Sequence, residues 1–283
     1  MKNKDSYGHV RGESLFLDDI NVRQGTLHGL VFDSPLAHGK IKNLDFSDAE
    51  NLEGIVKIFT FKDIPGENQI GGIIRDEPLF AEDEVHFIGQ PIAFILAESL
   101  AIAKKARKLI KIEIEELPVV TTAKLAFEKG LFINSPRTFR MGESEKSFEN
   151  CKSVFEGDTF TNGQEHLYLE TQSAYAFPLE DGNIKVISST QGPTLVQRIC
   201  AQVLGVSMHN IEVEAIRLGG GFGGKEDQAT AWAVMTALGV HRFNKPVKLV
   251  LERHDDMRMT GKRHPYNSHF KIGLDKNLKI LAF

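Results

Sequence analysis

The sequence has few cysteines, no excess of basic residues and no long apolar run. Its two cysteines, Cys151 and Cys200, are not in a metal-ligand or redox spacing, so we expect two reduced thiols and no iron–sulfur cluster held by this chain alone. There are 34 lysines and arginines against 38 aspartates and glutamates, a formal net charge of −4. This balance argues against partners such as nucleic acid or an anionic membrane.

Segments for targeting or membrane insertion are also missing from the pattern. No run of about 18 apolar residues occurs, so no membrane-spanning helix is predicted. The opening residues, 1–5, are polar and lack the apolar core of a signal peptide. These two observations predict a cytoplasmic location.

What is present is ordinary globular composition, 41% hydrophobic and 25% charged, over 283 residues. That length is enough for two domains of usual size. The clearest local unit is residues 91–116: an apolar run of buried-strand length, a helix that Ser99 can cap, and an alternating strand that Pro118 stops. We interpret it as β–α–β and expect a right-handed parallel crossover. We find no internal repeat.

A polar, irregular stretch at 130–150 predicts a boundary between two domains, 1–135 and 146–283. Before it, residues 1–24 are expected to be an irregular lead-in. After it, Pro193 and Gly205 bracket a predicted helix. The remaining expected strands are 26–32, 41–46, 55–61, 154–161, 173–177, 184–189, 211–218, 247–251, 269–274 and 279–283, and further helices are expected at 47–50 and 227–240. The last strand ends at Phe283 without a polar tail, which suggests a truncated domain or one completed by another polypeptide.

The chain is organised around a glycine loop, residues 219–226, expected between a strand and a helix. Such a loop lets backbone N–H groups approach a ligand without side chains in the way. A phosphate loop fits up to Lys225, but Glu226 stands where a hydroxyl should bind Mg²⁺. A dinucleotide fingerprint fits the glycines, but Asn244 stands where the acidic residue is expected.

A third interpretation uses more of the chain. Four motifs occur in order: Gly163-Gln164-Glu165-His166-Leu167-Tyr168-Leu169-Glu170-Thr171, Ser189-Thr190-Gln191, the glycine loop, and Thr260-Gly261-Lys262-Arg263-His264-Pro265. Together they resemble the molybdenum-binding subunit of the xanthine dehydrogenase and aldehyde oxidase family. Four earlier short motifs resemble that family's leading domain: Gly12-Glu13, Asp18-Asp19-Ile20, Asp63-Ile64-Pro65-Gly66 and Glu115-Glu116-Leu117-Pro118. The resemblance implies an α+β fold: an α/β hammerhead domain followed by an incomplete molybdopterin-binding domain.

The resemblance implies a site that hydroxylates a purine or another heterocycle with oxygen from water at a molybdenum–pterin centre. Gln191 matches the glutamine that hydrogen-bonds a molybdenum oxygen, and Phe222 matches the residue whose backbone N–H faces the same centre. Gly221 and Gly223 would let that backbone approach the cofactor closely. Glu226 matches a glutamate that hydrogen-bonds the purine, which favours the xanthine-oxidising branch over the aldehyde-oxidising one.

The resemblance also implies what this chain does not supply. The family's general base, a substrate-binding arginine and most pterin contacts would lie beyond Phe283, so no catalytic residue is assigned. Iron–sulfur clusters and FAD are expected on other modules, with the rest of the molybdenum subunit and a possible homodimer of the full complex as partners. We therefore expect the isolated chain to be inactive. The alternatives are a non-catalytic assembly fragment and a nucleotide-binding enzyme that uses the glycine loop.

Other polar residues near these motifs are given structural roles. His166, Tyr168 and Glu170 are interpreted as structural rather than catalytic. The group 263–265 is expected to buttress the loop by hydrogen bonding. The run His254-Asp255-Asp256 is interpreted as a solvated turn in preference to a metal site.

Overall fold

The computed structural model describes residues 5–283, and the chain forms two compact units. The first unit contains Met1–Pro118 and His166–Gly261, and the second contains Val119–Glu165 and Lys262–Phe283. The first four residues, part of the opening predicted to lack a signal sequence, lie outside the described residues. The predicted domain ranges, 1–135 and 146–283, stay a prediction.

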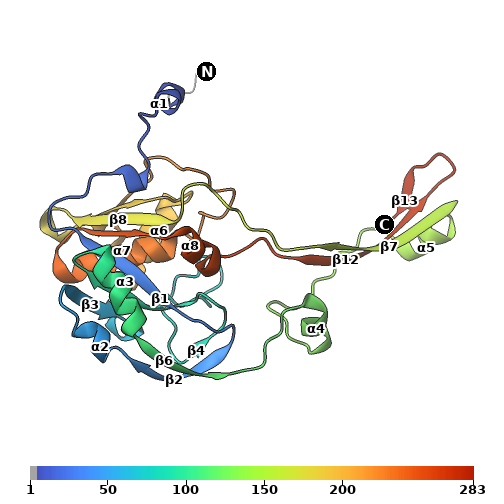
Figure 1. Ribbon diagram of the computed structural model, residues 1–283. Helices are drawn as coiled ribbons and strands as arrows, with labels where there is room; N and C mark the ends of the chain where they lie inside the picture. The colour runs from blue at the N-terminus through green and yellow to red at the C-terminus, as the bar shows by residue number, and fades with distance from the viewer. Residues whose placement is uncertain (1–4) are drawn as a thin grey trace. The chain divides into compact units, whose positions relative to one another are not determined.

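A seven-stranded sheet forms the centre of the first unit (Figure 1). Its order is β10-β9-β8-β11-β1-β5-β3, and β1 pairs in parallel with β11. Strands from the two ends of the sequence therefore share one sheet. The bounds are β1 (Leu27–Asp33), β3 (Ile55–Phe59), β5 (Pro91–Ala97), β8 (Ser173–Pro178), β9 (Ile184–Ser188), β10 (Ile211–Glu214) and β11 (Val247–Val250).

A small antiparallel sheet in the same unit has the order β4-β2-β6, with β4 (Glu84–Val85), β2 (Gly39–Asp45) and β6 (Lys111–Glu116). The expected parallel crossover over 91–116 is wrong, because β5 and β6 lie in different sheets. Every residue of β5 is buried, as a central strand requires, whereas β6 alternates between exposed and half-buried residues. The glutamates of β6 thus suit a sheet with one solvent-exposed face.

The helices of the first unit are α1 (Ser6–Arg11), α2 (Ser47–Glu50), α3 (Leu100–Leu109), α6 (Pro193–Leu204), α7 (Thr230–Phe243) and α8 (Arg253–Met259), with 3₁₀ turns at Leu17–Asp19, Phe61–Asp63, Glu180–Gly182 and Met208–Asn210. The Ser99 cap is confirmed, since its side chain accepts a hydrogen bond from the Ile102 amide. The bracketing of α6 is also confirmed: Pro193 opens it and Gly205 ends it in the left-handed region. The lead-in is less irregular than expected, because it contains α1.

Two apolar cores stabilise the first unit. The larger joins α6 and α7 to the seven-stranded sheet, and α7 is buried from Thr230 to Val240 without a break. The smaller lies between β5, α3 and the small sheet. The strand before the glycine loop is shorter than predicted, since β10 ends at Glu214, and the helix after it starts and ends three residues later than predicted, since α7 runs from Thr230 to Phe243.

The second unit is built on the sheet β13-β12-β7, with β7 (Ser153–Thr161), β12 (Tyr266–Leu274) and β13 (Ile280–Ala282). Its helices are α4 (Ala123–Glu128) and α5 (Ser144–Glu149). The predicted C-terminal hairpin is confirmed by the antiparallel pairing of β12 with β13. The hairpin predicted around 180–183 in the first unit is confirmed by the pairing of β8 with β9.

Both cysteines are free thiols, as predicted. Within residues 5–283, no helix combines the length and the apolar character needed to cross a bilayer.

Candidate functional site

The glycine loop is an irregular segment between the end of β10 and the start of α7. Phe222 adopts a positive φ of 56° and its side chain is 75% exposed. A left-handed conformation is strained for a bulky residue, so its persistence shows that the surrounding contacts fix the loop. Gly221 is required by close approach, because a Cβ there would lie 2.5 Å from Oε1 of Gln191.

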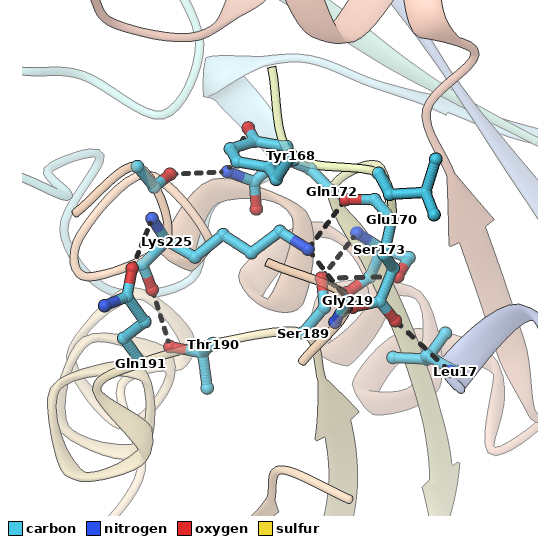
Figure 2. A network of polar contacts seen from close by, with 12 residues as sticks. Leu17, Tyr168, Glu170, Gln172, Ser173, Ser189, Thr190, Gln191, Gly219 and Lys225 are labelled. Atoms are coloured by element: carbon cyan, nitrogen blue, oxygen red, sulfur yellow. Dashed lines mark hydrogen bonds and ion pairs between the residues drawn. The ribbon is translucent and has the colours of Figure 1, made fainter. Parts of the chain in front are cut away.

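Gln191 lies between β9 and α6, and it holds the loop from the outside (Figure 2). Its backbone N–H donates to the carbonyl of Lys225 at 2.7 Å. Its side-chain Oε1 accepts from the amides of Gly223, at 3.1 Å, and Lys225, at 3.2 Å. The oxygen end of the amide is therefore occupied, and the nitrogen end is turned away from the Lys225 amide in Figure 2.

Lys225 holds the loop from beneath. Its side chain is fully buried, and Nζ donates to the backbone carbonyl of Glu170 at 2.8 Å and to Oε2 of Glu170 at 3.2 Å. The same ammonium lies 4.6 Å from the ring centroid of Tyr168. Burial lowers the pKa of Lys225, while Glu170 opposes this shift by favouring the charged form.

Glu170 connects the buried lysine to the rest of the loop. Its Oε2 also accepts from the amide of Gly219 at 2.9 Å, and its Oε1 accepts from the amide of Leu17 at 3.3 Å. A phosphate-loop lysine must reach its anion, but this one is enclosed and already paired. The structure therefore argues against the phosphate-loop interpretation.

Asp256, on α8, anchors the other side of this network. Its Oδ1 accepts from the Tyr168 hydroxyl at 2.9 Å, and its Oδ2 accepts from the Gln172 amide at 2.6 Å. The Gln172 side chain donates to the Tyr168 hydroxyl and to the carbonyl of Gly224. Burial, followed by the Asp256 charge, raises the pKa of Tyr168, so this hydroxyl stays protonated as a donor.

The expectation of a solvated turn at 254–256 is wrong for the two aspartates. Asp255 is 6% exposed and Asp256 is 1% exposed, and both lie on α8. Asp255 pairs with Arg107 of α3 and with Arg258, each at 2.8 Å. A short polar segment of sequence is typical of a solvent-exposed turn. Burial of these two carboxylates is tolerated here because guanidinium and hydroxyl groups pair with them.

Asp33, at the end of β1, belongs to the same acid–guanidinium group. Its carboxylate pairs with Arg258 at 2.9 Å. Burial raises the pKa of Asp33 to about 6 in spite of Arg258 and with the help of the nearby Asp255 charge. Adjacent residues of α8 therefore point to two groups: Asp256 to the loop, and Asp255 to β1 and α3.

The structure brings the predicted cofactor and substrate residues together on the first unit. Gln191 contacts the loop that carries Gly221, Phe222 and Gly223. Glu226 is exposed at the end of this loop, and its backbone carbonyl lies against Gly192, where an added Cβ would meet it at 3.1 Å. The predicted residues thus form one surface around Gln191.

The buried residues under that surface were not all found from the sequence. Tyr168 and Glu170 were given structural roles, whereas Gln172 and Asp256 were not recognised as partners of the loop. Their partners lie 52 and 84 residues away in the chain, and no local pattern signals such a contact. Arg263, expected to buttress the loop, donates to the carbonyl of Asn162 and pairs by its backbone with Gln164, within the second unit.

Comparisons with known proteins agree with this arrangement. The family model described as "Aldehyde oxidase and xanthine dehydrogenase, a/b hammerhead domain" matches residues 11–118, and the "Molybdopterin cofactor-binding domain" model matches residues 128–283. Xanthine dehydrogenase of Drosophila pseudoobscura pseudoobscura is 40% identical over 275 residues, and that of Dictyostelium discoideum is 36% identical over 282 residues. These alignments cover 96% and 100% of this chain but 20% and 21% of the relatives, so the chain spans about a fifth of their length.

Solved structures show the same fold at lower identity. The aldehyde oxidoreductase of Desulfovibrio gigas superposes with a TM-score of 0.85 and 24% identity, covering 97% of this chain and 32% of that one. Quinoline 2-oxidoreductase of Pseudomonas putida 86 gives a TM-score of 0.84 and 24% identity, with coverages of 99% and 38%. The predicted α+β fold is confirmed: the chain belongs to the aldehyde oxidase and xanthine dehydrogenase family and comprises its α/β hammerhead domain followed by part of its molybdopterin-binding domain.

Proposed function

We propose that this chain supplies one wall of the active site of a xanthine dehydrogenase-like molybdenum hydroxylase, which hydroxylates purines with oxygen from water. The observation that supports this most directly is the fixed amide of Gln191. Because Gly223 and Lys225 occupy its oxygen, the orientation of this side chain is set and its nitrogen is the end left to donate. A donor fixed in this way suits an anionic oxygen ligand.

The residues present fit a molybdenum–pterin group. Gln191 and the backbone N–H of Phe222 would hold it, with Gly221 and Gly223 allowing close approach. At Gly223 an added Cβ would meet nothing within 4 Å, so this part of the loop is open to a ligand. When bound, the group supplies the oxidising centre that takes electrons from the substrate carbon. Lys225 and Glu170 hold the loop in place through their pair and through the Gly219 amide.

Glu226 is the residue that would contact the substrate. Its exposed carboxyl can accept from a purine N–H, or donate to a ring nitrogen when protonated. A general base is not assigned within this chain, so we propose that the base, further pterin contacts and the iron–sulfur and FAD modules come from the rest of the enzyme. On this proposal the isolated chain does not oxidise xanthine.

The test uses the assembled enzyme with single substitutions. We expect Gln191→Ala to lower kcat by about 10-fold or more, since a fixed donor to a developing charge is lost. We expect Glu226→Ala to lower kcat/KM for xanthine by at least about tenfold while changing kcat/KM for an aldehyde much less. Equal losses on both substrates would contradict the purine contact, and xanthine oxidation by the isolated chain would contradict the division of the site.

Metal analysis separates this function from a non-catalytic assembly role. Purified native complex containing this chain should carry molybdenum in stoichiometric amount. A complex without molybdenum, isolated from cells that load other molybdenum enzymes, would favour the assembly role.

A further inference from the structure

A second group of metal-ligating side chains lies on the small sheet, apart from the glycine loop. Glu84 belongs to β4, His86 follows it, and His38 precedes β2. In the antiparallel register Gly39 pairs with Val85, which places His38 opposite His86. Since side chains alternate along a strand, Glu84 and His86 share a face with His38.

The three side chains bring their ligand atoms close together. Nε2 of His38 lies 2.8 Å from Oε1 of Glu84, and Nδ1 of His86 lies 3.8 Å from the same oxygen. One ligand atom from each residue falls within 4.8 Å of the others. A tetrahedral ion with bonds of about 2.1 Å separates its ligands by about 3.4 Å. Side-chain rotations that move the ligand atoms by on the order of 1 Å would therefore bring all three into the coordination shell of one ion.

The orientation of His38 is fixed in a way that favours metal binding. Its Nδ1 lies 2.8 Å from the carbonyl oxygen of Pro118, which can only accept a hydrogen bond, so Nδ1 carries a hydrogen and Nε2 faces Glu84. A backbone carbonyl on the outer nitrogen is a common support for a metal-bound histidine. Pro118 follows β6, which pairs with β2, so the sheet itself holds this acceptor in place.

We propose that His38, Glu84 and His86 bind one divalent transition-metal ion of the zinc class. Two imidazole nitrogens and one carboxylate oxygen suit such an ion, whereas Ca²⁺ and Mg²⁺ require oxygen ligands. The side chains are 30%, 33% and 62% exposed, which leaves a coordination position for water. On binding, the ion replaces the proton between His38 and Glu84, and that proton leaves to solvent.

A bound ion would stabilise the edge of the small sheet. β4 has two residues and pairs with β2 over two positions only. An ion held from both strands would tie this short strand down. The site involves none of the residues assigned to the molybdenum–pterin group, so this proposal does not depend on the proposed function.

Zn²⁺ titration of the full 283-residue chain, after removal of metal with a chelator, tests this site. Isothermal titration calorimetry should give one bound ion per chain. His38→Asn, Glu84→Gln and His86→Asn should each weaken binding by at least about tenfold, the loss seen when even an outer partner of a ligand is removed. Circular dichroism of the metal-free variants should match that of the parent chain, because each substitution replaces a partly exposed side chain with a polar one of similar or smaller size.

His269→Asn is the matched control. His269 is an exposed histidine of β12 with Asp158 and Glu156 within 3.1 Å, so it resembles the proposed site in composition but carries one imidazole. This variant should bind Zn²⁺ as the parent does. Binding that survives His38→Asn and His86→Asn, or that is lost with His269→Asn, would overturn the proposal.

Two further readouts separate a specific site from loose surface binding. Zn²⁺ at a hundredfold excess over Kd should raise Tm by about 5 °C, and equal concentrations of Ca²⁺ or Mg²⁺ should not raise it. Co²⁺ should develop the visible absorption of a low-coordinate site in the parent and lose it in Glu84→Gln. The absence of a Zn²⁺-dependent rise, or Co²⁺ absorption unchanged by the substitution, would contradict the site.

Discussion

Two charge clusters in the first unit meet at one short helix, α8, through its adjacent residues Asp255 and Asp256. The loop cluster contains Glu170, Lys225 and Asp256, with the hydroxyl of Tyr168 and the amide of Gln172. The helix cluster contains Asp33, Arg107, Asp255 and Arg258. The first holds the glycine loop, and the second holds α8 to β1 and α3. The loop is thus connected through α8 to the hammerhead part of the chain.

The clusters differ in which charge burial affects most. In the loop cluster a single ammonium is enclosed, and burial lowers the pKa of Lys225. In the helix cluster two carboxylates share two guanidiniums, and burial raises the pKa of Asp33 to about 6. In the loop cluster, removing Lys225 alone should therefore cost more than removing Lys225 and Glu170 together, whereas in the helix cluster loss of the Asp33 charge should be tolerated.

The largest effect is expected at Lys225. Lys225→Met should lower the free energy of unfolding by about 3–5 kcal/mol, because Glu170 keeps a buried charge with no cation facing it. The double variant Lys225→Met/Glu170→Gln should recover part of this loss. Urea unfolding of the chain measures both values. Lys111→Met, at an exposed ion pair with Asp48, is the control and should change stability much less, because solvent screens this pair.

If Lys225→Met and Lys111→Met were equally mild, the loop cluster would not depend on its lysine. Amide hydrogen exchange reports in addition whether the glycine loop itself opens more often, which the free energy of unfolding does not show. The amide of Gly219 should exchange faster in Lys225→Met than in the parent, since its acceptor, Oε2 of Glu170, is no longer held by the Lys225 ammonium.

A smaller, pH-dependent effect is expected at Asp33. Its folded pKa, about 6, lies above the unfolded value of 3.8, so the folded state binds this proton more tightly. That contribution is full below pH of about 4 and is lost as pH rises through 6. Asp33→Asn cannot ionise, so the variant should gain about 1–2 kcal/mol relative to the parent between pH 4.5 and 7.

Urea midpoints of the parent and Asp33→Asn at several pH values measure this gain. Asp48→Asn, the same substitution at an exposed carboxyl paired with Lys111, is measured alongside as the control. A stability difference that stays constant from pH 4.5 to 7 would show that Asp33 is ionised throughout and that Arg258 outweighs burial.

The smallest effect is expected on the exposed face of the loop, at Phe222. Its positive φ is strained for any side chain and most of all for a β-branched one. Phe222→Val should therefore lower the free energy of unfolding by about 1–2 kcal/mol, while Phe222→Gly should leave it within about 1 kcal/mol. A larger loss for glycine would mean that the aromatic ring, although 75% exposed, contributes packing that outweighs the strain.

Much of the fold follows from local pattern. The capped helix after Ser99, the helix between Pro193 and Gly205 and the hairpins at 180–183 and 275–277 could be predicted because their signals lie within a few residues. The sheet assignment of β6 could not, because the strand after a helix looks the same whether it returns to the same sheet or joins another. The exposure of its alternate residues was the available clue.

The candidate site divides in the same way. Gln191, Phe222 and Glu226 could be named because they lie in ordered sequence motifs. Asp256 could not, because its burial depends on Tyr168 and Gln172, more than 80 residues away. A polar word in a sequence carries no information about partners that reach it from another element, so a buried, satisfied aspartate and a solvated one look alike.

The sequence by itself determined the family, the α+β fold and the glycine loop, because these depend on ordered motifs and on local hydrophobic patterns. The tertiary structure decided how the loop is held. Only folding places Lys225 against Glu170, fixes the oxygen of Gln191 on two loop amides, and joins β1 to β11 in one sheet. These contacts depend on distances across the fold, because charge pairing and burial act between atoms that are close in space, whatever their separation along the chain.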